Sequence, residues 1–139
     1  MRGRRIRVFV SATADLEPER EVVGEALAKF PAPLPWEIRR TPHPGEQRPE
    51  ALREVRESDF YLLLLGEDIT APVGAELDAA LEAGQFVVAF VKDVARTPAG
   101  RFFRYNTIER WESFGDADAL RRLVVRHLSQ ALVDSSPGY

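Results

Sequence analysis

Glu76 has the strongest case for chemistry in this sequence, because of the residues that precede it. It follows a predicted loop, residues 66–74, and that loop leaves an unbroken apolar run, Phe60–Leu65. A carboxylate at this place can attack or stabilise the oxocarbenium-like carbon that forms when an N-glycosidic bond breaks. Glu76 also stands at the start of a predicted helix, residues 76–83, where the helix dipole favours a negative charge without further function. The residues alone leave both interpretations open.

Other common catalytic and cofactor motifs are missing from the sequence. It contains no glycine-rich dinucleotide or P-loop signature and no GxSxG nucleophile elbow. It has two histidines, no HExxH pattern and no cysteine, which argues against a metal site. We therefore expect no metal and no bound cofactor, and NAD enters only as a possible substrate. His43, in the proline-containing loop 41–49, is interpreted as a surface histidine.

The apolar runs predict the elements that position Glu76. Residues 60–65 and 86–91 do not alternate apolar with polar, which is typical of strands covered by helices on both faces. Residues 6–10 predict a first strand, Trp36–Arg40 alternate as an edge strand should, and residues 105–114 predict a last strand. Predicted helices follow every strand except the fourth, with Asp15 as the N-cap of the first and Asp116 or Asp118 capping the last. Residues 93–104 are interpreted as irregular.

This alternation predicts an α/β fold: a three-layer, open, parallel five-stranded sheet of flavodoxin-like order 2-1-3-4-5. In that order the connections leave the first and third strands toward opposite edges of the sheet. Ligands of such sheets bind at this switch point between the two strands. The loops after these two strands therefore converge on one crevice. We expect a ligand there to contact Ser11, Thr13, Asp15, Gly66 and Thr70.

The composition is that of a single globular domain. The chain has 139 residues, 45% hydrophobic and 29% charged, and we place the domain at residues 1–134 and a flexible tail at residues 135–139. The net charge of −3 gives no case for a nucleic-acid partner. No stretch approaches the ~18 apolar residues of a membrane span. We expect a cytoplasmic protein without membrane contact.

Two blocks of the sequence resemble one known family. Residues 8–20, VFVSATADLEPER, are similar to the opening of the domain-of-unknown-function 4062 (DUF4062) family, which has a strand, S-S-T, an aromatic residue and D-L-x-x-E-R. Ala12 and Ala14 replace the second serine and the aromatic residue of that pattern. The second block consists of Ser58-Asp59-Phe60, Gly66-Glu67, and Ala75-Glu76-Leu77 with Ala80 and Gly84. The resemblance extends over residues 5–93.

The resemblance implies a Toll/interleukin-1 receptor (TIR)-like fold, since the family is grouped with TIR-like domains and is similar to nucleoside deoxyribosyltransferases. In both groups a glutamate after the third strand carries N-glycosidic cleavage, and Glu76 matches that position. The first block can face a ligand, or its role can be purely structural, with an ion pair between Glu19 and Arg20.

Two functions follow as expectations. The first is a TIR-like signalling or interaction module that binds a nucleotide or nucleoside in the crevice and associates with itself or with a protein partner. Its candidate surface is the aromatic stretch 101–105, although Phe102 and Phe103 could equally close the edge of the sheet. The second is an enzyme, a hydrolase or transferase that acts on NAD or a nucleoside through Glu76.

Overall fold

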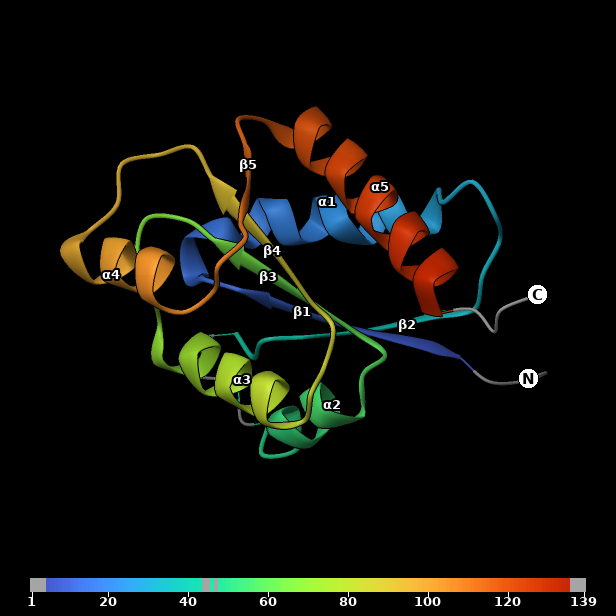
Figure 1. The fold of residues 1–139 in the computed structure, drawn as a ribbon, viewed down its shortest axis with the longest axis horizontal. Coiled ribbons are helices and arrows are strands. Elements are labelled where there is room, and N and C mark those ends of the chain that lie inside the picture. The colour runs from blue at the N-terminus through green and yellow to red at the C-terminus, as the bar shows by residue number, and fades with distance from the viewer. Residues whose placement is uncertain (1–4, 44–45, 47, 136–139) are drawn as a thin grey trace.

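The apolar runs form the centre of a five-stranded parallel sheet with the order β2-β1-β3-β4-β5, which confirms the predicted order (Figure 1). This computed structural model describes residues 5–43, 46 and 48–135. Residues 136–139 of the predicted tail lie outside the described residues, and Ser135 is the last residue of the final helix. The strands are β1 (Ile6–Ala12), β2 (Trp36–Arg40), β3 (Phe60–Leu65), β4 (Val87–Lys92) and β5 (Glu112–Phe114).

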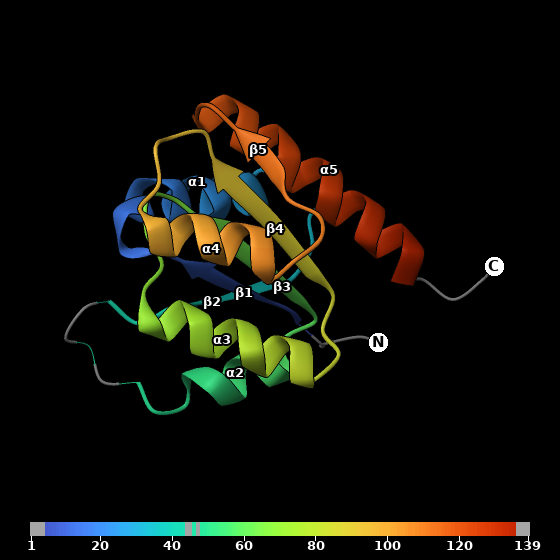
Figure 2. The same cartoon turned by 60° about the vertical axis from the view of Figure 1, so that its left-hand side comes forward.

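Helices cover both faces of the sheet (Figures 1 and 2). One face packs against α1 (Glu17–Ala28), which follows a short 3-10 turn η1 (Ala14–Leu16), and against α5 (Ala117–Ser135). The other face packs against α2 (Ala51–Glu57), α3 (Ala71–Glu82) and α4 (Pro98–Asn106). This is the expected three-layer arrangement.

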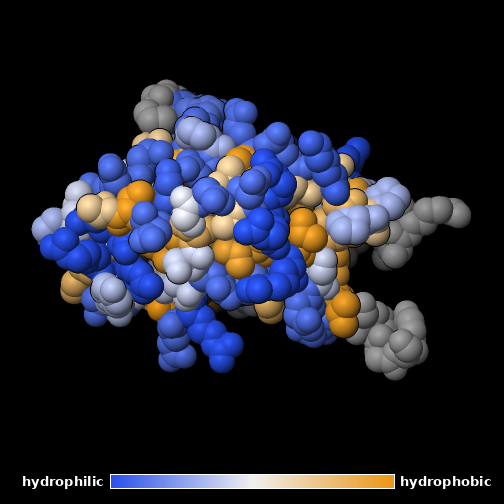
Figure 3. Space-filling model, turned by 90° about the horizontal axis from the view of Figure 1, so that it is seen from above, coloured by the Kyte–Doolittle hydropathy of each residue, from blue (hydrophilic) through white to orange (hydrophobic). Residues whose placement is uncertain are grey.

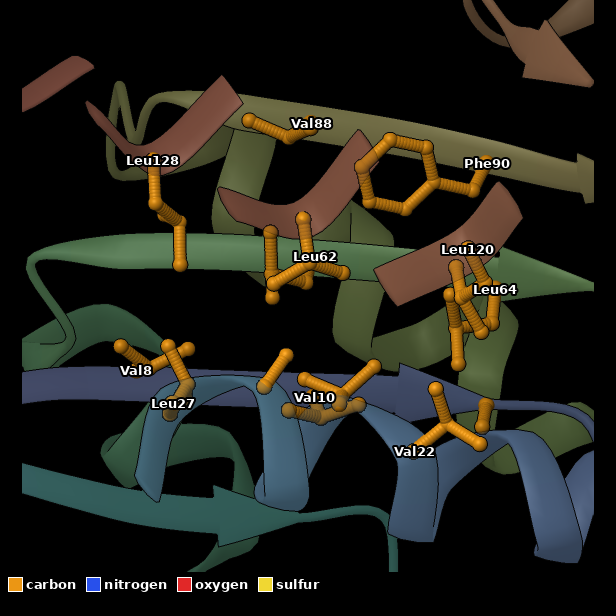
Figure 4. Packing of buried hydrophobic residues seen from close by; sticks show 14 of the residues in the cluster. Val8, Val10, Val22, Leu27, Leu62, Leu64, Val88, Phe90, Leu120 and Leu128 are labelled. Atoms are coloured by element: carbon orange, nitrogen blue, oxygen red, sulfur yellow. The ribbon is translucent and has the colours of Figure 1, made fainter. Parts of the chain in front are cut away.

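β3 lies between the two halves of the core, and all of its residues are buried. Leu62 and Leu64 point toward α1 and α5, where they pack with Val10 of β1 and Phe90 of β4 (Figure 4). Its alternate residues, among them Leu63, pack toward α2 and α3. A strand that is covered on both faces needs no alternation of polar and apolar residues. The unbroken apolar run therefore predicted β3 correctly.

The helix that carries Glu76 begins earlier than the sequence pattern predicted. α3 starts at Ala71, and Pro72 lies in its first turn, where proline costs no hydrogen bond. The first turn contains no acidic residue. The interpretation of Glu76 as an ordinary first-turn carboxylate is therefore wrong, because Glu76 lies in the second turn.

Two expectations for the C-terminal third are also corrected. Residues 98–106 form the helix α4, in which Phe103 is buried while Phe102 and Tyr105 are 69% exposed. The last strand is confined to Glu112–Phe114. Asp116 accepts a hydrogen bond from the backbone of Ala119 at 2.8 Å, so it caps α5 as expected.

Seen from the side of α5, the surface is mostly hydrophilic with scattered apolar residues (Figure 3).

Candidate functional site

Glu76 lies beneath the carboxyl edge of the sheet and is 1% exposed. Its Oε1 accepts a hydrogen bond from the Ser11 hydroxyl at 2.5 Å and another from the Thr41 hydroxyl at 2.7 Å. Ser11 is on β1, Thr41 directly follows β2, and both are buried. No hydrogen bond to Oε2 is formed within the described part of the chain. The two hydroxyls therefore fix the carboxyl group through one oxygen and leave the other available.

The surroundings of Glu76 shift its protonation equilibrium. Burial raises the pKa of the Glu76 carboxyl above its ordinary value, because the charged form loses its hydration. The hydrogen bonds from Ser11 and Thr41, and the charges of Arg48 and Arg20, oppose this rise. Glu76 is thus a buried carboxyl whose pKa is raised by burial and lowered by neighbours from distant parts of the sequence. Such opposing effects on a buried carboxyl are frequent at functional sites.

A pocket of about 570 Å³ lies next to this carboxyl. Thr41, whose hydroxyl donates to Glu76, lines the pocket, whereas Glu76 itself is not part of the lining. The pocket is bounded by the segment after β1, the segment after β2 and the beginning of α3. Its lining residues are Ala12, Thr13, Ala14, Glu17, Arg20, Thr41, Pro42, His43, Glu46, Arg48, Pro49, Thr70 and Pro72.

The charged groups of the pocket are engaged in hydrogen bonds and ion pairs, some with each other and some with residues outside the lining. Arg20 donates to the Thr41 carbonyl at 3.1 Å and to the Glu17 carboxylate, and its side chain is 10% exposed. His43 Nδ1 lies 3.1 Å from the Arg20 guanidinium and 3.2 Å from Glu17. Arg48 forms an ion pair with Glu54. His43 is a surface histidine as expected, with its side chain 44% exposed, and it also lines the pocket.

Arg20 and Glu19 tie α1 to different elements, so the expected Glu19–Arg20 ion pair is wrong. Arg20 holds the segment after β2 through Thr41, whereas Glu19 forms an ion pair with Lys92 of β4 at 2.7 Å.

The loops after β1 and β3 meet, as the switch-point argument predicted, but they close against each other. Asp15 accepts hydrogen bonds from the Thr13 hydroxyl at 2.8 Å and from the Glu67 backbone at 2.9 Å. The Gly66 backbone donates to Thr13 at 3.2 Å. Asp15 is therefore not the N-cap of α1, which has no side-chain cap. It joins the two loops instead.

The predicted site residues fall into three groups. Thr13 and Thr70 line the pocket, and Ser11 lies beneath it with Glu76. Asp15 and Gly66 are outside the lining and hold the loops together, so their contact with a ligand stays a prediction.

The sequence reasoning missed Thr41, Arg20 and Arg48 as parts of the site. A signal for Thr41 was present, because it ends a strand predicted to lie beside the first one, so both strands end at the same edge.

The described residues contain no group of three or more potential ligands that could hold a metal ion. Among the helices of the described part, none has both the length and the apolar character of a membrane span.

Comparisons with known proteins agree with this fold. The family described as Domain of unknown function (DUF4062) matches residues 7–129, whereas no curated protein sequence matches the chain. A CMP N-glycosidase, BcmB, from Clostridium botulinum is 14% identical, with a TM-score of 0.55 over 84% of this chain and 97% of the other.

Two further solved structures are similar. A flavodoxin, WrbA-like protein from Agrobacterium tumefaciens is 12% identical, with a TM-score of 0.56 over 91% of this chain and 97% of the other. The Flv1 flavodiiron core from Synechocystis sp. is 12% identical, with a TM-score of 0.53 over 94% of this chain and 36% of the other. At these identities the likeness concerns the flavodoxin-like fold.

Proposed function

The chain belongs to the DUF4062 family, and from the geometry of its pocket we propose that it binds a nucleoside or nucleotide and cleaves the N-glycosidic bond through Glu76. The observation that carries this proposal is the Glu76 carboxyl itself. It is buried under a pocket, held by two hydroxyls through Oε1, and has its second oxygen unengaged among the described residues.

The chemistry needs little besides a positioned carboxylate. In the reaction the bond between C1′ of the sugar and the base nitrogen breaks, and its electron pair leaves with the base, which takes up a proton. The Glu76 carboxylate either attacks C1′ or stabilises its developing positive charge. A water molecule or a second free base then forms the new bond to C1′ and loses a proton, which balances the proton taken up by the leaving base; water gives hydrolysis and a base gives transfer.

The pocket offers contacts suited to such a substrate. Thr70 and Thr13 line the pocket, the Thr13 hydroxyl being already hydrogen-bonded to Asp15 and Gly66, and Pro42 and Pro72 give apolar surface for a base. Because Thr41 lines the pocket and Glu76 does not, C1′ must pass Thr41 to reach Oε2. The structural likeness to a CMP N-glycosidase supports the proposal, since that protein places a nucleotide substrate on the same fold.

The test is product formation from a panel of CMP, other nucleoside monophosphates, nucleosides and NAD, with the free base detected by chromatography. The wild-type protein should release base from at least one of these compounds. Glu76→Gln should abolish release while the protein stays folded at the assay temperature, because glutamine keeps an acceptor for Ser11 and Thr41. Glu82→Gln, an exposed change in the same helix, is the matched control and should remain active. No base from any compound at high protein concentration contradicts the proposal.

A second function, as an interaction module, is favoured by one specific observation on α4. Phe102 and Tyr105 are each 69% exposed, and the Arg104 guanidinium lies 4.7 Å from the centre of the Tyr105 ring. Exposed aromatic residues beside arginines are enriched at the centres of protein interfaces. Phe103, by contrast, packs against Trp111 in the core and does not belong to this surface.

Light scattering across a range of concentrations tests self-association through this surface. The mass should rise with concentration, and Phe102→Ser should reduce the rise. A constant monomer mass at high concentration contradicts self-association.

A further inference from the structure

β3 carries a single polar side-chain group, the Tyr61 hydroxyl, and the fold buries it completely. Tyr61 is 0% exposed, and its hydroxyl has no hydrogen-bond partner within the described residues. A buried hydroxyl without a partner destabilises a fold, and phenylalanine would avoid that cost. The same sheet uses phenylalanine at Phe9, which stacks on the Tyr61 ring at 6.2 Å. Packing alone therefore does not account for the hydroxyl.

The position of Tyr61 in the sheet places its hydroxyl next to the site. β1 pairs with β3 so that Phe9 is opposite Tyr61 and Ser11 is opposite Leu63. Because side chains alternate along a strand, Tyr61 and Ser11 share the face that α3 covers, and they are diagonal neighbours. Ser11 in turn donates to Glu76 at 2.5 Å. The unpartnered hydroxyl thus lies beside the donor that fixes the carboxyl group.

We infer that Tyr61 is a positioning residue for Glu76 and acts through the Ser11 hydroxyl. In this arrangement the Tyr61 hydroxyl, which has no hydrogen-bond partner among the residues that the structure describes, turns to donate to Ser11 Oγ while Ser11 donates to Glu76 Oε1. Each donor in such a chain polarises the next one, which strengthens the final hydrogen bond to the carboxylate. The chain favours the ionised form of Glu76 and holds Oε1, so that Oε2 faces the substrate. The catalytic part of this inference rests on the proposed function.

The electrostatics around the pair are consistent with a permanent donor. Burial raises the pKa of the Tyr61 phenol, the Ser11 hydroxyl lowers it, and the charges of Glu76 and Asp78 raise it further. The phenol therefore keeps its proton wherever Glu76 titrates. The other charged groups that act on Glu76 are Arg48 and Arg20, and neither is altered in the test below.

A test without substrate measures how Tyr61→Phe changes the pH dependence of stability. Urea melts from acidic to mildly alkaline pH are recorded in the wild-type and the Glu76→Gln backgrounds. Without the Tyr61 donor the ionised carboxyl is less well stabilised, so the pKa of Glu76 should rise and its titration should move to higher pH. In the Glu76→Gln background Tyr61→Phe should have no pH-dependent effect. The inference is overturned if Tyr61→Phe changes stability equally at every pH in both backgrounds.

A kinetic test uses the substrate identified in the product assay. Tyr61→Phe should lower kcat about fivefold to tenfold, the value of one hydrogen bond, with KM within about twofold. The acid limb of the kcat/KM profile should move to higher pH, because less of Glu76 is ionised at a given pH. Val133→Ala, an exposed change on α5, should leave both quantities as in the wild type. An unchanged profile in Tyr61→Phe overturns the inference. If the wild-type protein releases no base, the proposed function fails, and the stability test still decides the role of Tyr61.

Discussion

Replacing Glu76 by glutamine should make the protein relatively more stable as the pH rises, even though the change removes the proposed catalytic group. The native state binds the Glu76 proton more tightly than the unfolded chain does, because burial raises the pKa of the carboxyl above its ordinary value of 4.5. From that ordinary pKa upward the native state holds more protons than the unfolded state, so the stability of the wild-type protein falls. The fall ends once the pH passes the pKa of the native carboxyl. Glutamine cannot ionise and contributes no such loss.

The size of the effect follows from the shift itself. Each tenfold difference in proton affinity between the native and unfolded states corresponds to about 1.4 kcal/mol of stability. The amide of glutamine introduces a buried NH2 group, but the cost of that group does not depend on pH. The quantity to compare is therefore the change with pH in the difference between the two unfolding free energies, rather than the difference at any one pH.

Urea melts at several pH values between about 4 and 8.5 measure this difference, since the pH range brackets the ordinary pKa of a glutamate. We expect the glutamine variant to gain on the wild type as the pH rises and the gain then to level off. Glu82→Gln, exposed on the same helix, should show no comparable trend. A constant difference, or a wild type that gains on the variant as the pH rises, would refute the claim that burial dominates the environment of Glu76.

Four further changes test the packing around the site by the same urea melts. Leu63→Ala should cost about 3–5 kcal/mol, in the upper part of the range for core truncations, because the residues paired with it on β1 and β4 have small side chains and cannot fill the cavity. Arg39→Ala, whose side chain is 49% exposed and forms two surface ion pairs, should cost at most about 1 kcal/mol, and a loss equal to that of Leu63→Ala would refute the contrast. Gly66→Ala should cost about 1–3 kcal/mol, since the new methyl group would lie 2.1 Å from Asp15 Oδ2 and break the hydrogen bond that this carboxylate accepts from the Glu67 backbone. Gly74→Ala, with nothing within 4 Å of the methyl group in α3, should instead gain up to about 1 kcal/mol, and a loss there would show that the space is not open.

The sequence pattern misplaced the start of α3 and missed α4, and both errors fall on segments that contain proline and glycine. Helix propensity predicted α3 only from Glu76, because Pro72 and Gly74 are poor helix formers in isolation. Tertiary packing overrides this preference: Val73 is fully buried against the sheet and draws the first turn into the helix. In the same way the burial of Phe103 selects α4 from a stretch that contains proline, glycine and three arginines. Propensity is a weak guide where one buried residue can decide the outcome.

Local patterns in the sequence predict the architecture and the place of Glu76 in it. Apolar runs such as Phe60–Leu65 are local signals, and two covered faces are typical of a parallel sheet with helices on both sides. The position of Glu76 after β3 follows from the same local order. The neighbours that give this carboxyl its properties, by contrast, depend on the tertiary structure. Ser11 and Thr41 reach it from 65 and 35 residues away, and no local pattern encodes such a meeting. Side-chain contacts of this kind depend on the register of the strands and the start of α3, because a shift of one residue in a strand turns every side chain to the other face.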